Sequence, residues 1–187
     1  MQVEALAPGF LIAAPMLKDP NFDHAVVLVC LRNEEGAMGL VINRPSPFTI
    51  TDIFEQIGIE FSLPITKHVM VGGPVEMQSG LLLYEVDSDS GIRAEELPIS
   101  DTLRLCPDRA VLQEIGKGKG PVRFQMYLGH AGWGPGQLES ELAQGVWIPG
   151  RVHPELIFSS PSDNCWERAL GAEGLDSTML SSFTTRA

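Results

Sequence analysis

Apolar residues lie along this chain in short runs that predict a sheet with a few short helices. Residues 25–32 (AVVLVCLR) are apolar on both faces, which predicts a strand in the centre of a sheet. Residues 9–14 predict an extended segment, and residues 37–42, after a turn at 33–36, predict the second arm of a hairpin. Gly39 inside that arm predicts a bulge or a closely packed neighbour.

The rest of the chain continues this alternation of strands and helices. Further strands are expected at residues 69–71, 81–85, 97–105, 122–128 and 146–148. Helical spacing of apolar residues predicts helices at residues 52–57 (capped by Thr49 or Thr51), 108–115, 137–144 and 164–171. Strands in hairpin-like order with intervening helices favour an α+β fold, a single compact domain with a mixed sheet, over residues 1–176. Residues 177–187, rich in Ser and Thr without periodicity, are expected to form a disordered tail.

The most unusual part of the chain is the stretch from Met126 to Leu142, MYLGHAGWGPGQLESEL. Its glycines are expected to end the preceding strand, either by adopting positive φ or by letting another segment or a ligand approach closely. Two interpretations follow: a tight structural turn with Trp133 as a core plug, which we favour, or a binding loop. A phosphate loop is disfavoured, because no phosphate-binding motif is present and Glu139 and Glu141 would repel an anion.

Residues 129–139 (GHAGWGPGQLE) resemble the glycine-rich signature of the YqgE/AlgH family. Other segments match in the family's order, namely residues 8–17 (PGFLIAAPML), 19–22, 36–45 (GAMGLVINRP) and 71–75 (VGGPV). The resemblance runs from about Leu6 to about Leu170. It implies a compact α+β fold with a bifurcated, partly barrel-like sheet flanked by helices. Some members are labelled transcriptional regulators, so the resemblance also implies that possibility.

Charge argues against direct contact with nucleic acids. The chain has 24 acidic against 13 basic side chains, a net charge of −11. Nucleic-acid affinity draws on Lys and Arg that neutralise phosphates, and anionic membrane surfaces attract the same residues. Neither a signal peptide nor an apolar run of membrane-spanning length is evident in the sequence. A cytoplasmic protein that contacts neither DNA nor membrane is therefore expected.

No recognisable catalytic, metal or cofactor motif is found. Cys30, Cys106 and Cys165 are odd in number and far apart, and they are expected to be free thiols. The histidines lie outside any nucleophile motif, and none has zinc-ligand spacing. His130, inside the glycine-rich stretch, is conceivable as a general base. Members of the resembled family often have Tyr at the matching position, which disfavours that role.

Three functional hypotheses remain. The favoured one is a non-catalytic module that binds a small molecule or another protein, with Arg44, Gly73, His130, Trp133 and Gln137 as candidate binding residues. Arg44 emerges from the end of a buried strand, so it is either an anion clamp at a pocket mouth or an arginine tied to a carboxylate or loop carbonyls. The second hypothesis is a transcriptional regulator that acts through a protein partner, and the third is an enzyme of unrecognised type.

Overall fold

The computed structural model describes residues 7–107, 109–159, 164–178 and 180. The strands are β1 (Gly9–Ala13), β2 (Val26–Asn33), β3 (Gly36–Val41), β4 (Pro45–Thr49), β5 (His68–Val71), β6 (Val75–Glu85), β7 (Leu97–Pro98), β8 (Leu103–Cys106), β9 (Phe124–Trp133) and β10 (Trp147–Gly150). The helices are α1 (Ile50–Ile57), α2 (Arg109–Gly116), α3 (Gln137–Ala143), α4 (Pro154–Phe158) and α5 (Cys165–Ala172).

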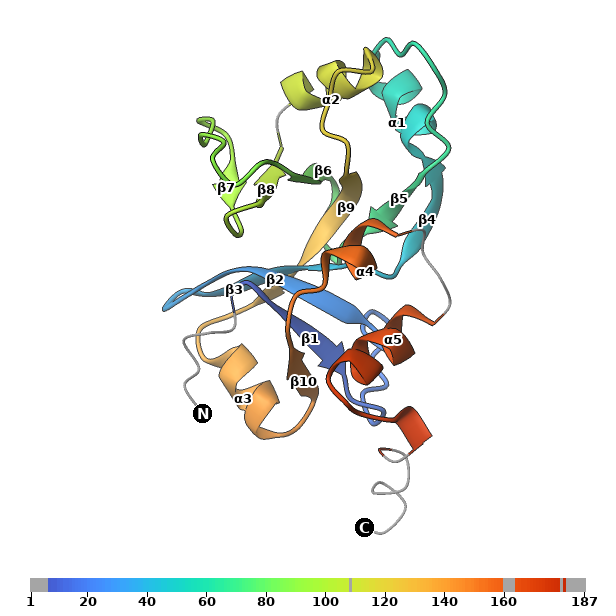
Figure 1. Ribbon diagram of the computed structural model, residues 1–187. Coiled ribbons are helices and arrows are strands. Elements are labelled where there is room, and N and C mark those ends of the chain that lie inside the picture. Colours follow the sequence, from blue (N-terminus) through green and yellow to red (C-terminus); the bar gives the residue numbers. More distant parts are fainter. Residues whose placement is uncertain (1–6, 108, 160–163, 179, 181–187) are drawn as a thin grey trace.

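Strand β9 connects the two halves of the molecule. Its first residues lie between β5, which is parallel to it, and β6, which is antiparallel. Its last residues, Ala131 to Trp133, pair with β3 instead, in the sheet order β10-β1-β2-β3. The sheet therefore splits along β9, as Figure 1 shows, with α1 and α2 beside one half and α3 and α5 beside the other. The expected α+β fold with a bifurcated sheet is confirmed.

The central strand was predicted correctly from its apolar faces. β2 pairs antiparallel with β1 and β3, and Val26 to Val29 are each 0% exposed. Gly39 lies opposite Val29, where the β2–β3 register shifts. A Cβ at Gly39 would lie 2.8 Å from the Leu28 carbonyl oxygen, so glycine is needed for this close approach. The helix expected near residues 52–57 begins at Ile50, with Thr49 as its N-cap in a capping box with Asp52.

Several expectations differ from the structure. The glycines do not end the strand that contains Tyr127, because β9 continues through Gly129 and Gly132 to Trp133. Gly129 has a φ of +70°, which bends the strand without ending its pairing. The strand expected at 97–105 is instead the short hairpin of β7 and β8. Strand β4 and helix α4 were not predicted, and β6 begins earlier than expected.

The predicted tail falls largely outside the described residues. Of residues 177–187, only Ser177, Thr178 and Leu180 are described, and they belong to a helical turn. The Leu180 amide donates to the Asp176 carbonyl at 3.1 Å, and the Thr178 amide donates to the Asp176 carboxylate at 2.8 Å.

Candidate functional site

The turn after β5 crosses directly over strand β9. A Cβ on Gly72 would lie 2.3 Å from the Gly129 carbonyl oxygen, and one on Gly73 would lie 2.2 Å from the His130 carbonyl carbon. Side chains of any size are therefore excluded from both positions. Gly73 also has a φ of +152°, which L-residues rarely adopt. This crossing explains Gly72, Gly73 and Gly129 as a backbone contact and places Gly73 against the His130 main chain.

Arg44 lies beside the same crossing. Its carbonyl accepts a hydrogen bond of 2.7 Å from the Val71 amide, which holds the segment between β3 and β4 next to the turn. A cavity of about 210 Å³ lies here, and the residues that line it include Arg44, Gly73, Asn21 and Met77. The structure thus brings together the strand end and the glycine turn that sequence alone did not connect.

The Arg44 guanidinium has few partners. Its Nη2 donates to the main-chain carbonyl of Asp23, and no carboxylate lies within ion-pair distance of it in the described part of the chain. The Asp23 carboxylate instead accepts from His24 at 2.7 Å and lies 3.8 Å from the Lys18 ammonium. The interpretation of Arg44 as an arginine tied to loop carbonyls is therefore met by one such hydrogen bond. Most N–H groups of the guanidinium are left for another acceptor among the described residues or in a ligand.

Trp133 and Gln137 lie in a different place and have their polar groups satisfied. The indole nitrogens of Trp133 and Trp147 donate to one Glu141 oxygen at 2.9 and 2.7 Å. The Gln137 amide donates to the other Glu141 oxygen at 2.9 Å, and its oxygen accepts from the Gly134 amide. We call Trp133, Gln137, Glu141 and Trp147 the Glu141 corner. Trp133 is only 6% exposed, as expected of a core plug.

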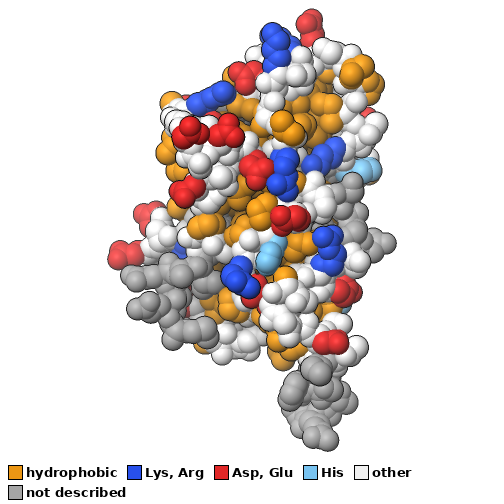
Figure 2. All heavy atoms as spheres, in the orientation of Figure 1, with side chains coloured by type: hydrophobic (Ala, Val, Ile, Leu, Met, Phe, Trp, Pro, Cys, Tyr) orange, Lys and Arg blue, Asp and Glu red, His pale blue; other side chains and the backbone are white. Residues whose placement is uncertain are grey.

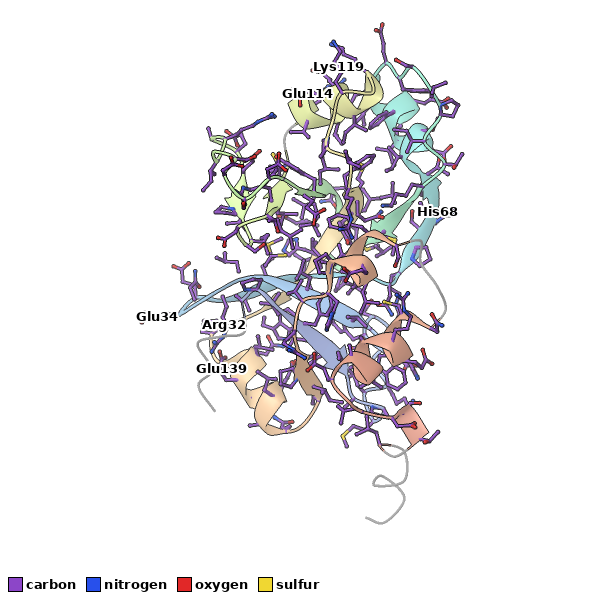
Figure 3. The ribbon with its side chains drawn as sticks, in the orientation of Figure 1. Arg32, Glu34, His68, Glu114, Lys119 and Glu139 are labelled. Carbon is purple, nitrogen blue, oxygen red and sulfur yellow. The ribbon has the colours of Figure 1, made fainter. Side chains whose placement is uncertain are left out.

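An ion pair ties helix α3 to the β2–β3 hairpin. The Arg32 guanidinium donates to the Glu139 carboxylate from Nε at 2.9 Å and from Nη2 at 2.5 Å. Figure 3 shows the two side chains next to each other, with Glu34 nearby in the hairpin. The hydrogen bond from Arg32 lowers the pKa of Glu139. Glu139 is therefore engaged in the fold and not directed at a ligand.

A larger apolar groove, which sequence reasoning missed, lies between α1, β6 and α2. It has a volume of about 460 Å³, within the range of small-molecule sites. Its lining includes Phe48, Ile57, Met77, Leu112 and Leu128. Figure 2 shows hydrophobic side chains reaching the surface at the α1–α2 end of the molecule.

Gly80 contributes no side chain to the sheet face under this groove. It precedes Leu82 and Tyr84 by two and four residues in β6, so a side chain at Gly80 would point to the same face of the sheet. Leu82 and Tyr84 pack there against α1 and α2, whereas Gly80 contributes no side chain. A glycine within a strand often marks a ligand or another backbone approaching closely, and this is the signal that would have pointed to the groove.

The groove ends where β6 leaves its regular pairing. The register with β9 shifts between Val75 and Gly80, and the residues between them are exposed. Met77 is 52% exposed and Phe48 is 50% exposed. Two large apolar side chains therefore stand at the rim of the groove, unlike the scattered apolar residues of an ordinary surface.

Two further polar clusters are occupied by internal contacts. Glu96, whose side chain is 3% exposed, accepts a hydrogen bond from the Tyr84 hydroxyl and lies 3.9 Å from the Arg104 guanidinium. Lys67 donates to the carbonyls of Phe124 and Phe158 and lies over both rings. Burial lowers the pKa of Lys67. Both clusters anchor strands and loops.

Nucleophilic and metal chemistry find little support in the described residues. Burial raises the pKa of the Cys30 thiol to about 12 and that of Cys165 to about 11, so both are protonated at neutral pH. Across residues 7–107, 109–159, 164–178 and 180, no group of three or more His, Cys, Asp or Glu side chains is arranged to hold a metal ion. The helices described there are all too short or too polar to cross a bilayer.

Comparison with known proteins decides the family. The chain matches the family described as AlgH-like over residues 10–178. It belongs to the AlgH-like family. A UPF0301 protein of Paraburkholderia phymatum and one of Burkholderia thailandensis are each 38% identical to it, over 94% of this chain and 92% of the relative. The YqgE/AlgH resemblance predicted from sequence is confirmed.

Solved structures agree with this AlgH-like assignment. The solution structure of the AlgH protein from Pseudomonas aeruginosa is 33% identical and has a TM-score of 0.77, covering 100% of this chain and 97% of that one. A crystal structure of a Corynebacterium diphtheriae protein also has a TM-score of 0.77, at 19% identity, covering 93% of this chain and 90% of that one. The second match supports the fold alone.

Proposed function

We propose that this AlgH-like protein is a binding module that takes a small apolar ligand into the groove between α1, β6 and α2. The observation that carries the proposal is the apolar groove of about 460 Å³ between α1, β6 and α2, to which Gly80 contributes no side chain. Native cores are close-packed, so an apolar space of this size with exposed Phe48 and Met77 at its rim favours a ligand site.

The lining favours binding over catalysis. Besides apolar side chains, the groove presents Gln56, Gln78, Cys106 and Arg109. Among the described residues that line it, no nucleophile is paired with a general base. The amide groups orient a ligand by hydrogen bonds, while Met77 and Met126 provide flexible apolar surface that adapts to its shape.

Filling the groove tests this proposal. A neutral naphthylamine fluorophore, which brightens in apolar surroundings, is titrated against the full chain and against Gly80→Val. A Cβ at Gly80 would lie 3.0 Å from the flexible end of Met126, so the variant is expected to fold while occupying the groove. We expect saturable binding by the parent protein and at least a tenfold weaker affinity for Gly80→Val.

Gly132→Val is the matched control. Gly132 lies in β9 outside the groove, and the nearest atom to a Cβ there is 3.8 Å away in the Val75 side chain. This variant should bind the fluorophore like the parent. Equal binding by the parent and Gly80→Val, with both folded by circular dichroism, would remove the basis of the proposal.

We further propose that any regulatory role of this protein works through a protein partner and not through direct DNA contact. The net charge of −11 supports this, because phosphate contacts need clustered basic residues. A mobility-shift assay with duplex DNA at low salt should show no complex. A tight complex that weakens as salt is added would contradict this part of the proposal.

A further inference from the structure

The apolar groove and the Arg44 cavity meet at one side chain. Met77 lines the groove of about 460 Å³ and also the neighbouring cavity of about 210 Å³ that contains Arg44 and Gly73. Because Met77 is 52% exposed and unbranched, it can change rotamer without disturbing the core. A ligand that reached from one space into the other would pass along Met77.

The described residues that line these two spaces carry charge of one sign. Among the described residues that line either space, the only charged side chains are Arg44 and Arg109, although the whole chain carries 24 acidic residues. The Arg109 guanidinium donates to the carbonyls of Ile57 and Gly58 at 2.7 and 3.3 Å, which engages it in the fold. Within the described part of the chain, the Arg44 guanidinium donates to a single main-chain carbonyl, that of Asp23.

We propose that the ligand is a long-chain carboxylate, with its head group on Arg44 and its unbranched apolar chain along the groove past Met77. This inference rests on the proposed function, since it names the ligand of the same groove. A planar guanidinium matches a carboxylate in a two-point hydrogen-bonded contact, and the Arg44 cavity is small. The groove beyond Met77 offers Phe48, Ile57 and Leu128 as apolar contacts for the chain.

The ligand class is tested with a series of saturated carboxylates. Acetate, octanoate and dodecanoate are titrated calorimetrically into the full chain, below the concentration at which the longer ones form micelles. Dodecanol and dodecyl phosphate serve as neutral and phosphate head groups. Affinity should rise by up to about fourfold per added methylene within the groove, since each buried methylene contributes about 0.8 kcal/mol. Dodecanoate should bind at least tenfold more tightly than dodecanol.

Arg44→Gln separates the head group from the chain. We expect this variant to bind dodecanoate ten- to a hundredfold more weakly while its affinity for dodecanol stays within twofold of the parent. Arg151→Gln is the matched control, because Arg151 is exposed and lines neither space. Thermal unfolding monitored by circular dichroism checks that each variant is folded.

The outcomes distinguish the ligand class from the binding function. If dodecanol and dodecanoate bind equally and Arg44→Gln changes neither, the carboxylate proposal is overturned while groove binding stands. If dodecyl phosphate binds more tightly than dodecanoate, the head group bound by Arg44 is a phosphate and not a carboxylate. A dimer that dissociates on Phe48→Ser, with no acyl compound bound, would assign the groove to a second copy of the chain. If neither acyl compounds nor the naphthylamine probe bind, both proposals are wrong.

Discussion

The Glu141 corner and the Arg44–Met77 region lie along the same glycine-rich segments but differ in how their polar groups are used. In the corner, one carboxylate accepts from two indoles and one amide, and the aromatic rings are buried. At Arg44, a guanidinium meets a single carbonyl beside exposed Met77 and an unfilled groove. The comparison teaches that glycine and tryptophan mark structure here, whereas unsatisfied donors and unfilled apolar space mark the candidate site.

The largest expected effect is on the corner. Trp133→Ala should lower the free energy of unfolding by about 3–5 kcal/mol, because it removes a 6% exposed ring that packs against Trp147 at 6.0 Å between centroids. Phe48→Ala, at 50% exposure on the groove rim, should change it by no more than about 0.5 kcal/mol. Urea denaturation measures both. Similar losses for the two variants would erase the distinction between the regions.

A second variant tests whether Gly73 belongs to the fold or only to the cavity. Gly73→Ala should destabilise the protein by about 2–4 kcal/mol, because the new methyl group would overlap the His130 main chain and the residue has positive φ. Gly136→Ala is the control, since its φ of +72° is strained but nothing lies within 4 Å of its Cβ.

The control should cost only about 1 kcal/mol in the same thermal or urea denaturation. If both glycine variants lose the same stability, positive φ alone explains Gly73 and the crossing over β9 contributes nothing. That result would favour the alternative that glycine is needed at position 73 to leave room for a ligand.

The sequence predicted strands and helices correctly where the local pattern of residues determines them. The two apolar faces of β2 predicted a central strand, and the helix expected at residues 52–57, capped by Thr49 or Thr51, begins within two residues of the start of α1. α4 was missed because a five-residue helix shows no periodicity. β9 was cut short because pairing with β3, far away in sequence, keeps the strand going through Gly129.

The candidate site was only partly predictable for the same reason. Arg44 was identified as a charge emerging from a buried strand, and the structure adds that Gly73 shares its cavity. The groove was missed, because it arises where α1, α2 and β6 meet, and its one local sign, Gly80, lay just before the strand expected at residues 81–85. Trp133 and Gln137 were chosen for their residue types, but their donors are committed to Glu141.

A smaller effect is expected when the Glu141 carboxylate is neutralised. Glu141→Gln keeps the shape but replaces one acceptor oxygen by a donor, so one of its three N–H partners loses its acceptor. Hydrogen bonds to charged groups contribute about 1.5–3 kcal/mol, and we expect a loss of about 1–2 kcal/mol, measured by urea denaturation. Glu35→Gln, at an exposed hairpin position, should be neutral. If Glu141→Gln leaves the free energy of unfolding unchanged, packing alone stabilises the Glu141 corner.

The smallest effect concerns the pair that joins α3 to the β2–β3 hairpin. Arg32 lowers the pKa of Glu139 in the folded protein, so the carboxylate stabilises the fold above its unfolded pKa of about 4.3 and loses that contribution as pH falls through the lower folded value. The Glu139 side chain is 40% exposed, so solvent limits the gain to about 1 kcal/mol or less.

Glu139→Gln should therefore be less stable than the parent at pH 7, and the difference should shrink between pH 5 and pH 2.5, when unfolding is measured at each pH and constant ionic strength. Glu55→Gln, an exposed carboxylate on α1, should show no such convergence. Added salt should reduce the Glu139 effect because the pair is partly in solvent. A difference that persists at pH 2.5 would show that Glu139 stabilises α3 through its packing and not through its charge.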